Sequence, residues 1–253
     1  METDIARSLH SVKFPKPVSL LVLAPHPDDF DAIGITMRFF QQNGNPIQLA
    51  VATTGASGVQ DSFCAQPTLQ LKSEIRELEQ RDSCRFFGLP DSNLTFLRLE
   101  EDKDGRLSKN DVNLHRVNAQ LQALSPKMVF LPHWNDSNLT HQRVYDIFKK
   151  LAREGGYSLV AFLNRDPKTI EMRNDIYTEF DEKEAAWKAK LLRFHRSQQQ
   201  RNLDQRGYGM DERILRTDRQ SARACSLEMP YAEVFELEFF GGENLEDILN
   251  GRI

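Results

Sequence analysis

Cysteine is scarce in this sequence, and the cysteines that are present form no recognisable pattern. Cys64, Cys84 and Cys225 are odd in number, lie far apart and include no C-x-x-C pair. A disulfide framework uses an even set of cysteines, and a thiolate metal site uses closely spaced pairs. We therefore predict three reduced cysteines that act as small buried hydrophobes, and neither kind of site.

Long apolar runs are also missing. No run approaches the roughly 20 residues that a membrane-spanning helix needs, and the first one, residues 18–24, follows an acidic start instead of a basic signal-peptide region. With 33 Lys and Arg against 37 Asp and Glu, the net charge is −4, and 40% of the residues are hydrophobic. This composition excludes disorder, collagen and coiled coil as the main architecture. It predicts a folded cytoplasmic protein with no membrane partner.

The first two-thirds of the chain alternates between short apolar runs and longer amphipathic stretches. The expected strands are residues 18–24, 47–54, 94–99, 128–131 and 157–163, and the expected helices are residues 28–42, 69–87, 111–124 and 138–153. Apolar strands that alternate with helices are typical of a parallel sheet covered on both faces. We therefore predict an α/β core over residues 1–165, built on a doubly wound, mostly parallel, Rossmann-like sheet.

Residues 166–253 differ in character from this core. The pattern there predicts an alternating stretch at 170–177, a charged helix at 181–197, a loop rich in Gln, Arg and Gly, a second helix, and a last strand at 233–240. No linker or internal repeat marks a boundary. We expect a single domain over residues 1–253, in which the C-terminal α+β extension packs on the core and completes the site.

The extension contains a basic region in an otherwise acidic protein. Residues 183–223 include eleven Lys and Arg but only five Asp and Glu. One interpretation is a solvated helix face, and the other is a basic rim, including Arg201 and Arg206, that attracts an anionic substrate. Nucleic acid is not expected as a partner, because the whole chain is acidic.

The motif Pro25-His26-Pro27-Asp28-Asp29 stands where the first core strand ends and a helix begins. His26 and Asp29 lie three residues apart, so a tight turn can aim an imidazole nitrogen and a carboxylate oxygen at one divalent metal. Asp28 would lie beside the metal, where a carboxylate can accept the proton of a metal-bound water. The same residues are also explained by two aspartates that cap the helix and a histidine in a surface turn.

A metal site of this kind needs a further ligand, because catalytic zinc usually takes three from the protein. His10 and His115 are expected at or near the surface. His133 and His141 both follow the apolar run 128–131 and so lie at the same edge of the sheet as the first motif. We favour His141 as the ligand, with His195 as a more distant candidate.

Segments spread over most of the chain resemble the PIG-L/LmbE-like family of metal-dependent de-N-acetylases. In order along the chain these segments are residues 25–29, Thr54-Gly55, Arg76-Glu-Leu-Glu79, residues 87–91, His141, residues 190–198 and Tyr231-Ala-Glu-Val-Phe235. The resemblance implies a zinc-dependent hydrolase that removes an acetyl group from an N-acetylated sugar of the N-acetylglucosamine type, a glycoside or a related small amide. It is also compatible with a homo-oligomer.

The resemblance also implies roles for individual residues. His26, Asp29 and His141 would hold one Zn²⁺ per chain, Asp28 would be the general base, and Arg76 would bind substrate. Thr54 is a further candidate for substrate binding. Trp134 has two interpretations, since it can stack on a sugar face or simply pack.

The chain departs from the family at its H-x-D-H motif. The corresponding stretch is Asn138-Leu-Thr-His141, so the ligand is kept while the first histidine is replaced by Asn138. An asparagine amide can donate to a developing oxyanion, a contact worth roughly 2.7 to 4 kcal/mol in other enzymes, but it cannot deliver a proton. His133 and His195 are candidates for that role. Asp136 is explained either as a partner of a ligating histidine or as a turn former.

Three other functions compete with deacetylation. The altered motif is compatible with a catalytically weak or inactive carbohydrate-binding homologue. Two histidines and one carboxylate also describe the ligand set of Fe(II) oxygenases, and metal content would separate those from a zinc enzyme. A nucleotide-binding protein is less favoured, because no G-x-G-x-x-G follows the first strand.

Overall fold

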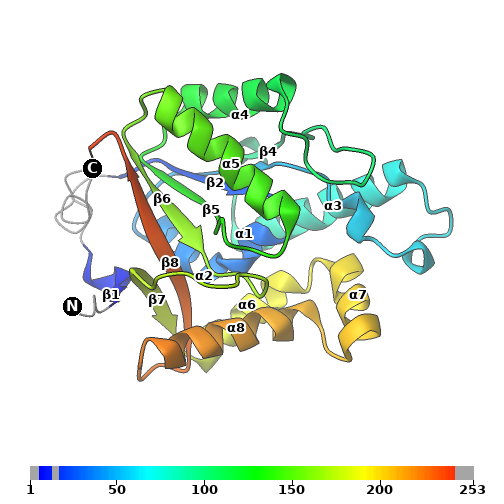
Figure 1. The fold of residues 1–253 in the computed structure, drawn as a ribbon. Helices are drawn as coiled ribbons and strands as arrows, with labels where there is room; N and C mark the ends of the chain where they lie inside the picture. Colours follow the sequence, from blue (N-terminus) through cyan, green and yellow to red (C-terminus); the bar gives the residue numbers. More distant parts are fainter. Residues whose placement is uncertain (1–5, 13–16, 243–253) are drawn as a thin grey trace.

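The computed structural model describes residues 6–12 and 17–242. These residues contain one mixed sheet with the strand order β1-β7-β8-β6-β5-β2-β3-β4 (Figure 1). The strands are β1 (Arg7–Ser8), β2 (Leu20–Ala24), β3 (Ile47–Val51), β4 (Leu94–Phe96), β5 (Met128–Pro132), β6 (Leu159–Asn164), β7 (Ile176–Phe180) and β8 (Tyr231–Phe240). From β4 to β6 every pair is parallel, whereas β8 is antiparallel to β6 and β7. The predicted α/β fold with a mostly parallel sheet is confirmed.

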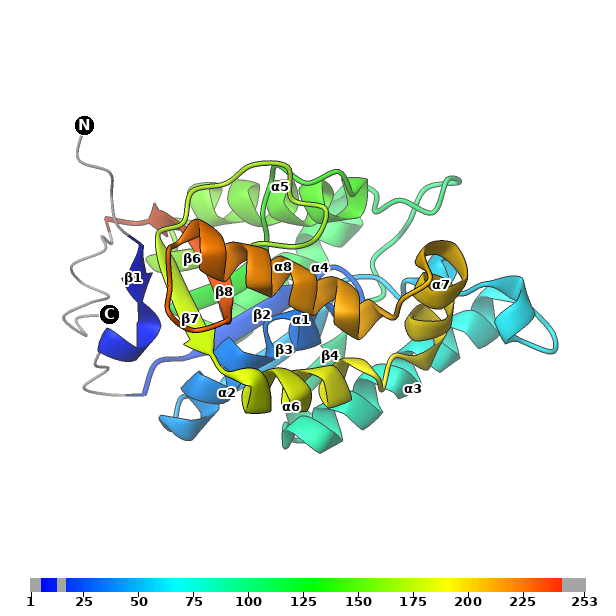
Figure 2. The same cartoon turned by 90° about the horizontal axis from the view of Figure 1, so that it is seen from below.

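Helices cover both faces of this sheet. They are α1 (Asp29–Ala32), α2 (Gly34–Gln42), α3 (Leu69–Phe87), α4 (Asp111–Leu124), α5 (Leu139–Glu154), α6 (Glu182–Leu192), α7 (Arg196–Arg206) and α8 (Met210–Ala224). Figure 1 shows α4 and α5 on one face, and Figure 2 shows α2, α6 and α8 on the other. The sheet is therefore doubly wound, as the alternating sequence pattern predicts.

The two hydrophobic cores follow from the alternation of side chains along each strand. Leu20 and Val22 of β2 join a cluster with α2, α3 and α6, whereas Leu21 and Leu23 join a second cluster with α4 and α5. Successive strand side chains point to opposite faces, so a strand covered on both faces must be apolar throughout. This explains why β2 and β5 read as continuous apolar runs with all residues buried.

Two helices begin and end where the sequence predicts. Helix α3 starts after Thr68, whose side chain accepts the Leu71 N–H, and it ends at Gly88, which adopts the left-handed conformation with φ 91°. Helix α4 starts after Asn110, whose side chain accepts the Asn113 N–H. Local capping residues determine these boundaries.

Two other predicted boundaries are wrong. The helix expected at 28–42 is divided at Ile33 into α1 and α2. The helix expected at 181–197 ends at Leu192, and the Gln- and Arg-rich segment expected to be a loop is helix α7. The break falls at His195, whose buried ring pairs with Asp31 of α1. This boundary is set by a contact between two residues that lie 164 positions apart in the sequence, and not by a local glycine or proline.

The alternating stretch expected at 170–177 is strand only from Ile176 onward. Before that point the chain pairs with the loop after β5: the Ile170 N–H donates to the Asn135 carbonyl at 2.9 Å, and Thr169 forms an isolated bridge with Asp136. The segment is extended, but it pairs with a loop that carries site residues and does not pair with a strand of the sheet.

The C-terminal extension is joined to the core by buried polar contacts. The Glu233 carboxylate on β8 accepts the N–H groups of Ile35 and Thr36 at the start of α2, at 3.0 and 2.7 Å. Lys188 on α6 is fully buried and pairs with Glu233 at 2.8 Å and with Asp218 at 2.6 Å. We propose, on these contacts, that core and extension form one domain.

Over the described ranges, no helix combines the length and the apolar character needed to cross a membrane. The three cysteines are free, as expected, and Cys84 is buried as predicted. The prediction of burial is wrong for Cys64 and Cys225, which are only half-buried.

Candidate metal centre

The order of the strands places a site between β2 and β5. The chain continues from β2 to β3 on one side, whereas β5 leads to β6 on the other, so the strand order reverses between β2 and β5. Ligands of open α/β sheets bind at the carboxyl ends of the strands at such a point. The loop after β2 carries His26 and Asp29, and the helix after β5 carries His141 in its first turn.

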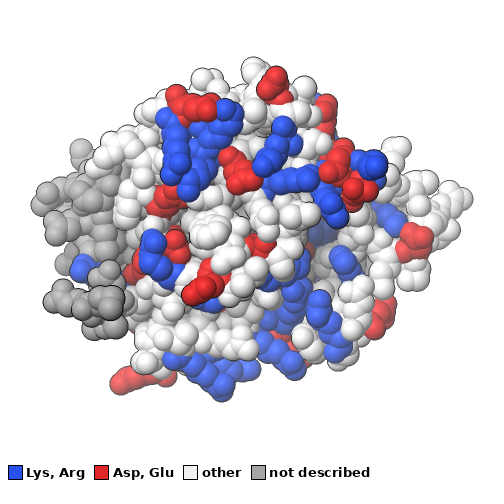
Figure 3. Space-filling view, in the orientation of Figure 1, with Lys and Arg blue, Asp and Glu red and all other residues white. Residues whose placement is uncertain are grey.

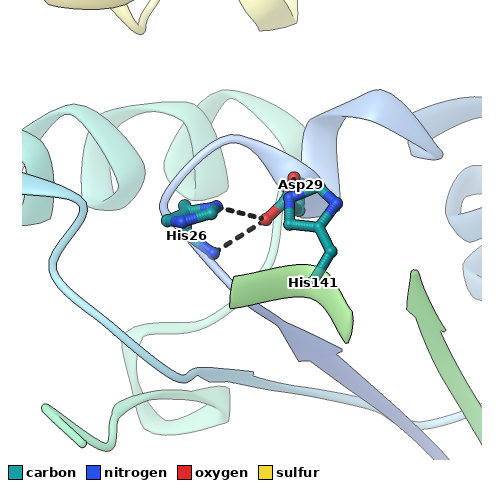
Figure 4. A group of neighbouring side chains, drawn as sticks. All are labelled: His26, Asp29 and His141. Carbon is teal, nitrogen blue, oxygen red and sulfur yellow. Dashed lines mark hydrogen bonds and ion pairs between the residues drawn. The ribbon is translucent and has the colours of Figure 1, made fainter. Parts of the chain in front are cut away.

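The three side chains converge from these two segments (Figure 4). One donor atom from each of His26, Asp29 and His141 lies within 4.8 Å of the others. Asp29 Oδ2 accepts the His26 backbone N–H at 2.7 Å and lies 3.4 Å from His26 Nδ1, while Asp29 Oδ1 lies 3.7 Å from His141 Nε2. Two imidazoles and one carboxylate are a donor set that zinc and other divalent transition metals use. The residues therefore fit a metal.

Asp136 holds His141 in the orientation that a ligand requires. Its Oδ2 lies 3.1 Å from His141 Nδ1, so a proton on Nδ1 leaves Nε2 free to face Asp29. The other oxygen accepts the Asn138 N–H at 2.6 Å. Asp136 is completely buried. It therefore fills both roles that the sequence left open, since it orients the histidine and closes the turn.

The protonation of the site reflects opposite charges in close contact. Burial would raise the pKa of Asp29, but His141 and His26 outweigh it and hold that pKa well below its ordinary value. Burial would lower the pKa of His141, but Asp29 and the hydrogen bond with Asp136 raise it to about 9. The pair is therefore ionised, and a cation that binds here displaces the proton of His141.

Asp28 lies beside these three residues and lines the same cavity. Its Oδ2 accepts a hydrogen bond from Arg76 Nη2 at 3.0 Å, and Arg76 also donates to the Pro27 carbonyl. Its backbone N–H donates to Gln80 Oε1 at 3.1 Å. With φ 126°, Asp28 occupies a region that favours glycine, so its backbone is strained, at a cost on the order of 1 to 3 kcal/mol.

The structure brings Asn138 to the cavity but not the two histidines suggested as its substitutes. The Asn138 Oδ1 caps α5 by accepting the Thr140 N–H at 3.0 Å, which leaves the amide nitrogen available to donate. His133 is buried and pairs with Glu236 at 3.3 Å. His195 is buried against Asp31. Neither ring is among the residues that line the cavity.

Of the three residues expected to bind substrate, one lines the cavity and two do not. Arg76 is 2% exposed and lines the cavity, where its Nε and Nη1 have no hydrogen-bond partner within the described residues. Thr54 accepts a hydrogen bond from Ser73 at 3.1 Å, and Trp134 is half-exposed and packs on the His133 ring. Neither Thr54 nor Trp134 lines the cavity, which the glycines after Thr54 reach instead.

The cavity has a volume of about 450 Å³ and an unequal distribution of charge. Its acidic end holds Asp28, Asp29 and Asp166, a residue that the sequence analysis missed. Asp166 also forms a second cluster of donor atoms with Asp136 and His141. It follows β6 by two residues, so its position at the carboxyl edge of the sheet was a signal that could have found it. Burial raises its pKa.

The fold and this cavity define the chain as a doubly wound α/β protein with a candidate two-histidine, one-carboxylate metal centre. A family model described as GlcNAc-PI de-N-acetylase, PIG-L, matches residues 21–152, which is more than half of the chain. The chain therefore belongs to the PIG-L family of hydrolytic deacetylases. A search of curated protein sequences gives no significant match.

Solved structures with the same fold include enzymes of two reaction types. N,N'-diacetylchitobiose deacetylase from Pyrococcus horikoshii is 17% identical with a TM-score of 0.71, and the alignment covers 87% of this chain and 83% of that one. The 4-carboxy-2-hydroxymuconate hydratase of Pseudomonas putida is 18% identical with a TM-score of 0.67, over 90% and 99% of the chains. A deacetylase of an antimicrobial pseudoaglycone is 14% identical, with a TM-score of 0.64, over 90% and 100%. At these identities the likeness establishes the fold.

Proposed function

We propose that this protein is a zinc-dependent hydrolase that removes the acetyl group from an N-acetylated amino sugar of the N-acetylglucosamine type. The observation that carries the proposal is the convergence of His26, Asp29 and His141 beside Asp28, at one end of a cavity, in a chain of the PIG-L family. The three converging residues would hold one zinc ion per chain.

The roles of the surrounding residues follow from their positions. Zinc bound at this centre would polarise the acetyl carbonyl and increase the acidity of a water molecule. Asp28 takes the proton of the attacking water and passes it to the amine nitrogen as the amide C–N bond breaks. Arg76 fixes the Asp28 carboxylate through its bond to Oδ2. The amide of Asn138 donates to the oxygen that gains charge, which is the part of the missing histidine's role that an amide can fill.

The substrate class rests on the family and on the neighbours. The family is named for a de-N-acetylase of an N-acetylglucosamine lipid, and one structural neighbour deacetylates diacetylchitobiose. A hydratase has the same fold, so the fold alone does not select the bond that reacts. Release of acetate, which hydration does not produce, is therefore the decisive readout.

We expect Asp28→Asn to bind metal normally and to release acetate about 10²- to 10⁴-fold more slowly, because the amide cannot accept the proton of water. His141→Ala should lose both metal and activity. Metal content is measured by elemental analysis, and acetate release is measured with N-acetylglucosamine and diacetylchitobiose. Asp111→Asn, an exposed aspartate at the start of α4, is the matched control and should behave as wild type.

Other outcomes would favour a rival. Sugar binding without acetate release by the wild-type protein would support the carbohydrate-binding homologue that the altered H-x-D-H motif suggests. Iron at one equivalent per chain would support an oxygenase. An Asp28→Asn variant with the wild-type rate would remove Asp28 from the proposed mechanism.

A further inference from the structure

One face of helix α7 lines the cavity and is strongly basic. Gln198, Arg201, Asn202, Gln205 and Arg206 all contribute to the lining, and their spacing of three and four residues is that of a single helical face. The following helix, α8, adds Arg213 to the same wall. The basic region of the sequence therefore includes three arginines that face a cavity.

These three arginines differ from their neighbours in their acidic partners. Arg193 pairs with Asp211 at 2.7 Å, and Arg216 pairs with Glu212 at 2.5 Å. In contrast, no carboxylate within the described ranges lies at ion-pair distance from the cavity cluster, defined as Arg201, Arg206 and Arg213. Arg201 donates to the Gly58 carbonyl, at 3.5 Å. The solvated-face interpretation fits the paired arginines but not this cluster.

The cavity cluster and the acidic end of the cavity belong to different elements. Asp28 and Asp29 extend from the loop after β2, whereas the cluster belongs to the wall formed by α7 and α8. Figure 3 shows Lys and Arg side chains gathered where α7 and α8 meet in Figure 1. Burial and then repulsion from Arg76, with smaller contributions from Arg206 and Arg213, lower the pKa of Arg201 and outweigh the opposing attraction of Asp28. The like charges are therefore only partly compensated, and a bound anion would relieve the repulsion that remains.

We propose that the cavity cluster of Arg201, Arg206 and Arg213 binds an anionic group of the substrate, a phosphoryl or carboxylate group, while the acetamide lies at the metal end of the same cavity. This inference rests on the proposed function. Guanidinium groups match the oxygen geometry of phosphate and carboxylate and bind them with charge-assisted hydrogen bonds. A concave, unpaired basic wall also concentrates anions near the site. The preferred substrate is therefore an acidic N-acetyl sugar and not a neutral one.

The kinetic signature follows from the separation of binding and chemistry. The cluster contacts a part of the substrate that does not react, so its loss should raise KM much more than it lowers kcat. One charge-assisted bond contributes about tenfold or more in affinity. Salt should weaken the binding of the acidic substrate, because exposed charges are screened over about 10 Å at 0.1 M ionic strength.

The experiment compares acidic and neutral substrates with the metal-loaded protein. Acetate release is measured with N-acetylglucosamine 1-phosphate and 6-phosphate, with N-acetylmuramic acid as the carboxylate probe, and with N-acetylglucosamine and diacetylchitobiose as neutral probes. We expect kcat/KM at least tenfold higher for one acidic class, and the phosphate and carboxylate arms identify which group is recognised. Arg201→Gln, Arg206→Gln and Arg213→Gln should each raise KM for that substrate about tenfold, with little change for the neutral sugars.

Matched controls come from the same two helices. Arg196→Gln at the start of α7 and Arg223→Gln at the end of α8 change the net charge equally, but both side chains are exposed and neither lines the cavity. Both should retain the wild-type KM. The inference would be overturned if KM rose equally in these controls and in the variants of the cavity cluster. Equal kcat/KM for acidic and neutral substrates would overturn it as well.

A binding measurement separates this inference from the proposed function. Calorimetry with inorganic phosphate, N-acetylglucosamine 6-phosphate and N-acetylmuramic acid reports on the cluster even if no acetate is released. Binding that disappears in Arg201→Gln and persists in Arg196→Gln would support the anion site while the proposed chemistry fails. Acetate release from neutral sugars without any binding of these anions would overturn the anion site and leave the proposed function standing.

Discussion

A single aspartate shows how the candidate centre is prepared before any metal binds. Asp136 is buried, and each of its oxygens has a separate task, one toward the His141 ring and one toward the backbone of Asn138. The arrangement holds the histidine ring with Nε2 directed at Asp29. Residues outside the ligand set therefore determine the position of a ligand.

We expect Asp136→Asn to weaken zinc binding about 10- to 100-fold, because an amide holds the imidazole less firmly and makes its nitrogen less basic. The asparagine can still accept the Asn138 N–H, so the turn and the fold should persist. Competition with a chromogenic chelator gives the affinity, and circular dichroism checks the fold. Asp146→Asn, exposed on the same α5 helix, is the control. An unchanged affinity would contradict the role assigned to Asp136.

The sequence could predict the residues of the centre that belong to a local motif. His26, Asp28 and Asp29 stand together after a strand, and His141 follows a second strand, so the α/β topology alone brings them to one edge. Asp31 could not be found in the same way, because it is explained only by its pairing with His195, far away in the chain. Asp166 was missed, although it follows β6 at the same edge of the sheet and this position was a usable signal.

At the scale of elements, the start of α2 is stabilised by a residue of another strand. Glu233 of β8 accepts N–H groups at the start of α2. Lys188 of α6 pairs with two carboxylates, those of Glu233 and of Asp218 on α8. The carboxylate that accepts these N–H groups therefore lies 198 residues from Ile35 in the sequence. Capping by a distant carboxylate leaves no local signal, which is why the break between α1 and α2 could not be predicted.

We expect Lys188→Met to lower the free energy of unfolding by about 3 to 5 kcal/mol, because two buried carboxylates would lose their counter-ion. Urea denaturation followed by circular dichroism measures the change. Lys190→Met is the matched control, since Lys190 lies two residues further along the same helix and is exposed. The interpretation fails if the two substitutions lower the free energy of unfolding equally, or if neither substitution lowers it.

At the scale of the whole molecule, the sheet is continuous from the core into the extension. β8 pairs with β6 along six residues and with β7 along five, and α7 and α8 form a wall of the cavity whose floor belongs to the core. A unit that shares its sheet, its core and its cavity should unfold as a unit.

The two tryptophans allow this to be tested, because Trp134 lies in the loop after β5 and Trp187 lies in α6. We expect the single-tryptophan variants Trp134→Phe and Trp187→Phe each to give coincident urea transitions by fluorescence and by far-ultraviolet circular dichroism, in the presence of a metal chelator. The mutations alter stability, so the comparison is made within each variant. Separate midpoints for the two probes would indicate that the extension is an independent domain.

The strained backbone at Asp28 has a consequence for protein engineering. Glycine adopts φ 126° without strain, so Asp28→Gly would relax the loop, but it would also remove the carboxylate that lies 3.0 Å from the buried guanidinium of Arg76. The strain costs on the order of 1 to 3 kcal/mol, whereas removing one partner of a buried ion pair costs about 3 to 5 kcal/mol. A library built for heat resistance can therefore leave this position unchanged, because endurance and chemistry favour the same side chain here.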